Sequence, residues 1–85
     1  MGANIPSSEL AIKLAAEHRL ALKGFAVSCG PTGGVVIDRG GHVHGVWHFV
    51  KGNFFWTPAG YNEPIYKTAA LSEAVTYTME IVEKG

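Results

Sequence analysis

The chain has 85 residues, in which 7 Lys and Arg balance 7 Asp and Glu, and 47% of the residues are hydrophobic. This length fits a single domain, and the hydrophobic content is high enough for a packed core. Zero net charge provides no basic field for nucleic acid, so we expect no nucleic-acid partner. No apolar run reaches the roughly 18–20 residues that a membrane span needs, so we expect no membrane association.

The start of the chain and its cysteine content predict a location. Met1–Pro6 contains neither the basic nor the apolar segment of a signal peptide, and the single Cys29 cannot form an internal disulfide. We therefore expect a cytoplasmic protein. Charged residues make up only 16% of the chain. Such a low charge density gives little protection against association and indicates a partner or a self-complementary surface.

The first element is expected to be a helix. Ser7 or Ser8 can cap it, and Pro6 disfavours an earlier start. The helix should end at Lys23, because Gly24 suits the left-handed position that follows a helix. A periodicity of 3.6 residues predicts one apolar face, formed by Leu10, Leu14 and Leu22 together with Ala11, Ala15 and Ala21.

Short apolar segments separated by glycine-rich turns fill the middle of the chain. These segments predict strands over residues 25–29, 35–38, 42–50 and 54–57, with a possible edge strand over 65–67. The turns between the first four strands are too short for crossover connections, so neighbouring strands should be antiparallel. An irregular loop over residues 58–64 precedes the edge strand.

A second helix should run from about Ala69 or Leu71 to Lys84, with Thr68 or Ser72 as its cap. Its inner stripe is predicted to contain Leu71, Ala74, Val75, Thr78 and Val82, whereas Glu73, Glu80 and Glu83 lie outside. The fold class is therefore a single two-layer α+β domain over residues 1–85. It comprises a helix, an antiparallel meander of three to five strands and a helix, with both helices on one face of the sheet.

Three histidines on the longest predicted strand form the first candidate site. A period of two residues places His42, His44 and His48 on one face, together with Val46 and Val50. Two imidazoles at positions i and i+2 of a strand can both approach a metal ion, with Asp38 as a conceivable third ligand. His48 is too distant to join them unless the strand bends at Gly45. A half-exposed strand with no bound metal is the alternative that we favour, and we expect no cofactor.

Other polar residues have structural interpretations that we favour over catalytic ones. His18 falls on the apolar face of the first helix, where a satisfied core or interface histidine is expected. Cys29 could pair with His42 or His44, but nothing nearby would lower its pKa, so we expect a small buried hydrophobic residue. The segment 30–34 is glycine-rich without the ending of a phosphate loop, and we predict a turn there.

Aromatic residues form the second candidate site. Seven of the nine aromatic side chains lie between Trp47 and Tyr66, and Lys51 is the only formally charged residue between Gly40 and Asn62. Both faces of the predicted hairpin carry large apolar groups, so one face should contact a partner unless the sheet curls enough to hide it. The predicted contact residues are Trp47, Phe49, Phe54, Phe55, Trp56, Tyr61 and Asn62.

The element order of helix, three strands and helix resembles that of the double-stranded-RNA-binding domain and of the HicA toxin family. The segment Gly40-Gly41-His42 is loosely similar to the HicA motif, in which a strand histidine follows Gly-Ser. The second helix has only Lys67 near its start, whereas an RNA-binding domain places a lysine cluster there. The likeness is one of topology, and no family follows from it.

We therefore expect a small protein-binding inhibitor or adaptor, not an enzyme, that acts through the aromatic hairpin. It should form a homodimer or join a complex, as would suit a phage or bacterial regulator. The alternative is a histidine-dependent metal-binding or nucleolytic protein centred on His42, His44 and His48.

Overall fold

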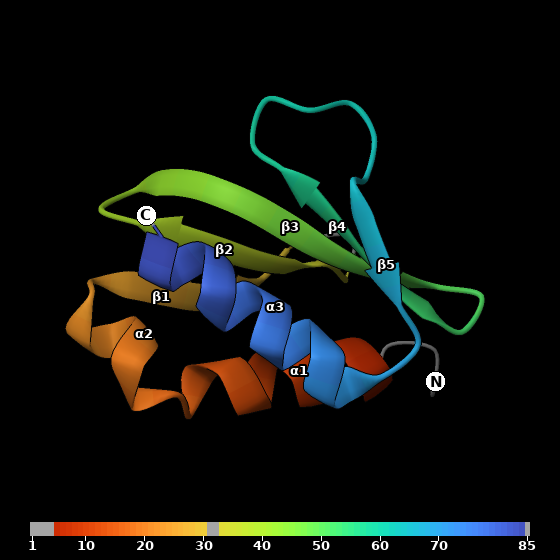
Figure 1. The fold of residues 1–85 in the computed structure, drawn as a ribbon, viewed down its shortest axis with the longest axis horizontal. Coiled ribbons are helices and arrows are strands. Elements are labelled where there is room, and N and C mark those ends of the chain that lie inside the picture. Colours follow the sequence, from red (N-terminus) through yellow and green to blue (C-terminus); the bar gives the residue numbers. More distant parts are fainter. Residues whose placement is uncertain (1–4, 31–32, 85) are drawn as a thin grey trace.

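The computed structural model describes residues 5–30 and 33–84. Its elements follow one another as α1 (Ile5–Ala15), α2 (His18–Leu22), β1 (Phe25–Cys29), β2 (Val35–Arg39), β3 (His42–Val50), β4 (Asn53–Pro58), β5 (Tyr66–Thr68) and α3 (Leu71–Lys84) (Figure 1). The five strands form one sheet in the order β1-β2-β3-β4-β5, and every neighbouring pair is antiparallel. The predicted α+β class with a meander sheet is confirmed.

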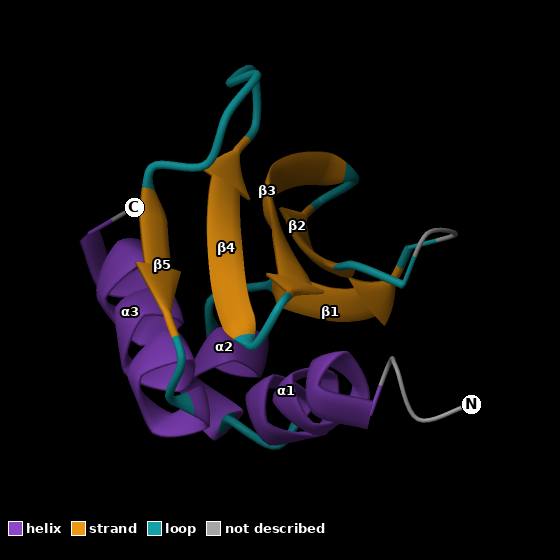
Figure 2. Ribbon diagram, turned by 90° about the vertical axis from the view of Figure 1, so that its right-hand side faces the viewer, coloured by secondary structure: helices purple, strands orange, loops and turns teal. Residues whose placement is uncertain are grey.

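The three helices of the described residues lie on the same side of the twisted sheet (Figure 2). On the covered side, Leu10 and Leu14 of α1 are fully buried, as are Val35 and Ile37 of β2. The predicted inner stripe of α3 is confirmed, because Ala74, Thr78 and Val82 are buried and Leu71 and Val75 pack against the core. No helix in the described ranges is long and apolar enough to cross a membrane.

The first predicted helix is broken into two. It starts at Ile5, two residues earlier than expected, because the fixed φ of Pro6 suits the first turn of a helix. It ends at Ala15, and α2 begins at His18 after Glu17 adopts an extended conformation. The break lets Leu20 be buried, at 2% exposed, although it is six residues after Leu14 and would leave the apolar face of a continuous helix. Leu22, predicted to be inner, is instead 71% exposed.

Two hairpin turns fix the register of the central strands. Gly40 and Gly41 connect β2 to β3 with φ values of 60° and 85°, and Lys51 and Gly52 connect β3 to β4 with φ values of 51° and 86°. Positive φ at both central residues is the two-residue turn whose twist matches that of a hairpin. Gly30 N–H donates to Gly34 O at 2.7 Å and closes the turn before β2. The middle of that predicted turn, residues 31–32, lies outside the described residues.

A buried polar contact joins α3 to the centre of the sheet. The indole Nε1–H of Trp47 donates to Thr78 Oγ1 at 2.8 Å, and Thr78 Oγ1 donates to Ala74 O at 2.8 Å. Trp47 is 0% exposed and Thr78 is 1% exposed. Buried indole N–H groups require such an acceptor, so this contact fixes α3 over β3.

Candidate functional site

The largest aromatic side chains of the hairpin belong to the core. Trp47, Phe54 and Trp56 are 0%, 3% and 2% exposed. Trp47 and Trp56 are paired across β3 and β4, with ring centroids 5.3 Å apart. Phe49 is half-buried against this cluster, with its ring 4.8 Å from that of Phe54. The prediction that the two tryptophans and Phe54 contact a partner is wrong. The helices cover this face, and each of the three side chains is at most 3% exposed.

The remaining predicted contact residues lie at the surface or near it. Phe55 is half-buried on the opposite face of β4 from Phe54 and Trp56. Tyr61 and Asn62 are exposed on the loop that follows β4, and Tyr61 retains 60% of its accessible surface. Ala59 N–H donates to His44 O at 2.9 Å and ties the start of this loop to β3. A partner contact for Phe55, Tyr61 and Asn62 stays a prediction.

A bulge in β3 separates His42 and His44 from His48. Gly45 pairs with Ile37 whereas Val43 pairs with Asp38, so His44 is an extra residue that reverses the alternation of side chains. The ring of His44 packs edge-on against the buried Phe25, with centroids 4.8 Å apart. The predicted common face of the histidines is therefore wrong.

The other two histidines lie on opposite sides of the bulge. His42 pairs with Arg39, whose guanidinium lies 4.8 Å over the ring of Phe25. His48 lies on the uncovered face, where its Nε2 would be 3.0 Å from a Cβ added at Gly34. Within residues 5–30 and 33–84, no three His, Cys, Asp or Glu side chains gather closely enough to hold a metal ion.

His18 and Cys29 also differ from their predicted settings. His18 begins α2 and is exposed, because the break after Ala15 removes it from the apolar face of α1. Cys29 ends the edge strand β1 and is exposed as a free thiol, whereas a buried side chain was expected. Edge position explains this difference, since β1 has a neighbouring strand on one side only.

The sheet face that none of the described helices covers is the candidate functional surface. We call it the outer face and define it by Val36, Val46, His48, Val50, Phe55, Thr57 and Ile65. The first six alternate with the inner residues of their strands, and Ile65 lines a shallow hollow with Phe55 and Lys67. Val50 is 49% exposed and Ile65 is 55% exposed. Solvated faces of antiparallel sheets are usually polar, so an apolar outer face indicates a contact surface.

Two charged side chains flank the outer face. Asp38 follows Val36 and Ile37 on β2, and Lys67 of β5 pairs with Phe55 of β4. They are the only formally charged residues that strand alternation places on this side of the described sheet. Val36 and Ile65 were not among the predicted contact residues. The run Val35-Val36-Ile37 was an available signal, because consecutive apolar residues put apolar groups on both faces of a strand.

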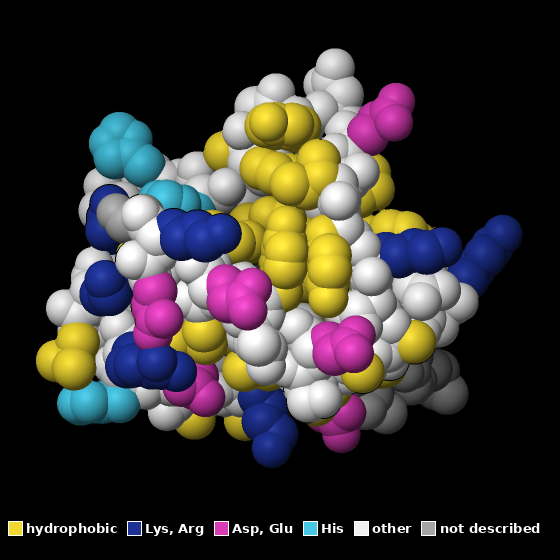
Figure 3. Space-filling view, viewed as in Figure 1, with side chains coloured by type: hydrophobic (Ala, Val, Ile, Leu, Met, Phe, Trp, Pro, Cys, Tyr) yellow, Lys and Arg dark blue, Asp and Glu magenta, His cyan; other side chains and the backbone are white. Residues whose placement is uncertain are grey.

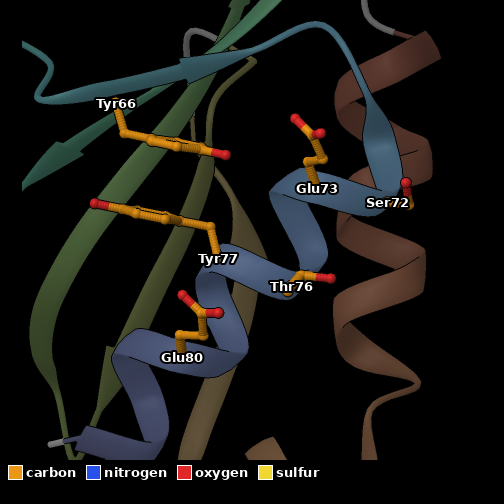
Figure 4. A pocket seen from close by; sticks show the side chains of 6 residues that line it. All are labelled: Tyr66, Ser72, Glu73, Thr76, Tyr77 and Glu80. Carbon is orange, nitrogen blue, oxygen red and sulfur yellow. The ribbon is translucent and has the colours of Figure 1, made fainter.

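A second surface feature, which was not predicted, joins β5 to α3. The rings of Tyr66 and Tyr77 stack with centroids 3.8 Å apart and planes 2° from parallel. They line a hollow of about 480 Å³ together with Ser72, Glu73, Thr76 and Glu80 (Figure 4). Hydrophobic side chains gather over this junction, with acidic side chains beside them (Figure 3). The spacing of Glu73, Tyr77 and Glu80 on one helix face was the available signal.

The surroundings of Tyr77 in this hollow disfavour ionisation of its phenol. Burial raises the pKa of the Tyr77 phenol above its ordinary value of 10.0, and the neighbouring Tyr66 and Glu80 raise it further. Glu73 accepts a hydrogen bond from Thr68 Oγ1 at 2.5 Å, which stabilises the chain where it enters α3. Thr68 Oγ1 also accepts a hydrogen bond from Ala70 N–H at 3.1 Å. The Thr68–Glu73 hydrogen bond and the Tyr66–Tyr77 stack both hold α3 against β5.

Comparison of the chain with models of known protein families, with curated proteins and with solved structures found no match.

Proposed function

We propose that this chain is a small protein-binding domain, not an enzyme, that forms a homodimer through its outer face. The apolar character of the outer face carries the proposal, because it presents Val36, Val46 and Phe55 on three adjacent strands that no helix of residues 5–30 and 33–84 covers. Removing apolar surface from water favours association by about 25 cal/mol for each Å², from which the entropic and desolvation costs of binding are subtracted.

Charge supports a second copy of the chain as the partner. The chain has 7 basic and 7 acidic residues, so two copies approach each other without net repulsion. The flanks of the outer face carry one acid and one base, Asp38 and Lys67, so the surface can complement itself. Most oligomers of identical chains use such a self-complementary patch about a twofold axis.

The solution mass of matched variants tests this proposal. Val46→Glu and Val50→Glu place a charge on the outer face and should convert the dimer to the monomer, because a carboxylate cannot be buried there without a partner. Leu22→Glu is the control, since Leu22 is also an exposed apolar side chain but lies on α2. A dimer that resists both valine substitutions and dissociates with the Leu22 substitution would place the interface on the helices.

A further inference from the structure

The register of the sheet determines where the midpoint between the two charged residues of the outer face lies. Val46 pairs with Thr57 in the middle of the face, on the two strands β3 and β4. On one side, Val36 of β2 pairs with Val46, and Asp38 lies two residues further along β2. On the other side, Phe55 lies two residues from Thr57 along β4, and it pairs with Lys67 of β5.

The two displacements run in opposite directions, each over two residues of its own strand, and the bulge at His44 leaves Asp38 opposite Val43. Antiparallel pairing means that the step from Val36 to Asp38 runs toward the start of β3, whereas the step from Thr57 to Phe55 runs toward its end. Asp38 and Lys67 are therefore each one strand and two residues away from the Val46–Thr57 pair, in opposite directions. The midpoint between the two charges therefore falls close to this pair.

We propose that two copies pack outer face to outer face about a twofold axis that passes over the Val46–Thr57 pair, so that Asp38 of each copy meets Lys67 of the other. The axis lies in the interface, at right angles to the line that joins Asp38 and Lys67 of one copy. A rotation of 180° about it exchanges the positions of the two charges. The arrangement rests on the proposed homodimer, to which it adds one register out of the many that an apolar face allows.

The charges select this register because the alternatives are unfavourable. Sliding or turning one copy would set Asp38 against its own equivalent, or leave it facing Val36 and Val46 without a cation. Like charges in contact and unpaired charges on an apolar surface both destabilise an interface. With both pairs formed, each copy contributes one acid and one base, and the two contacts are identical by symmetry.

Charge reversal tests the arrangement, with the dimer dissociation constant measured by sedimentation equilibrium at low salt. We expect Asp38→Lys and Lys67→Asp each to raise the dissociation constant at least about tenfold, because each change sets like charges together in two places. The double variant should return it to within about threefold of the parent value, since the pairs form again with their signs exchanged.

Glu9→Lys is the matched control for Asp38→Lys, because Glu9 is exposed on α1 and the substitution changes the net charge equally. Circular dichroism establishes that each variant folds, and Lys67→Asp tests the same contact if Asp38→Lys does not fold. A dimer in which folded single variants associate like the parent, or in which the double variant stays as weak as the singles, overturns this register. That result leaves the homodimer itself standing, whereas a parent that is always monomeric overturns both.

Discussion

The hydrogen bond between Trp47 and Thr78 provides a direct test of how α3 is held on the sheet. Thr78→Val keeps the branched shape of the side chain and removes its hydroxyl. The donor of Trp47, 0% exposed, then loses its acceptor at 2.8 Å. The carbonyl of Ala74 loses only an extra contact, because it remains within the α-helical ladder.

The expected cost follows from this geometry. Leaving a buried N–H group without an acceptor lowers the free energy of unfolding by about 1–3 kcal/mol. For a domain of this length, a loss of 2 kcal/mol lowers the melting temperature by roughly 8–16 °C. Urea unfolding, monitored by tryptophan fluorescence, measures the free energy of unfolding, and calorimetry measures the melting temperature.

A double-mutant cycle with Trp47→Phe isolates the contact. Phenylalanine has no N–H group, so Thr78→Val should cost at least about 1 kcal/mol less in the Trp47→Phe background than in the parent. An equal cost in both backgrounds would show that the Thr78 hydroxyl stabilises the fold through something other than its hydrogen bond with the indole.

Three further substitutions have expected outcomes. Gly45→Ala should lower the free energy of unfolding by about 1–3 kcal/mol in urea, because the added methyl group would overlap the ring of Trp56; unchanged stability would contradict this packing. Lys51→Asn should raise stability by roughly 0.5–1 kcal/mol, since Lys51 has φ of 51° and asparagine tolerates the left-handed region better; no gain would argue against strain there. Glu80→Gln should lower the pKa of Tyr77 in an ultraviolet phenolate titration, because it removes a charge that opposes the phenolate; an unmoved midpoint would contradict the assigned cause. The raised pKa of Tyr77 also predicts stability that is fully present below pH 10 and is lost as the pH rises through the folded value.

The sheet could be predicted from the sequence because its signals are local. The glycine pair Gly40–Gly41 marks one end of β3 and the Lys51–Gly52 turn marks the other, and the predicted span of residues 42–50 is confirmed. The break between α1 and α2 could not be predicted in this way. Periodicity assumed one continuous helix and favoured Leu22, whereas packing against the sheet buries Leu20. Tertiary contacts decided between two leucines that have equal helix propensity.

The candidate surface was predicted only in part, for a similar reason. Alternation along a strand separates Trp47 from Val46 and His48, but it does not state which set the helices cover. The bulge at His44 reversed this alternation and separated His48 from His42 and His44; Gly45 was the available signal, because an isolated glycine inside a strand often marks a bulge. The Tyr66–Tyr77 stack depends on the docking of α3 beside β5, which is a contact between elements and leaves only a weak trace in the sequence.

Sedimentation equilibrium of the parent chain over a wide concentration range tests whether the chain associates with itself through the outer face. We predict a mass that rises with concentration to twice the 9.1 kDa of the monomer, and a Val46→Glu variant that stays at the monomer mass throughout. A parent chain that stays at 9.1 kDa at every concentration would contradict the account.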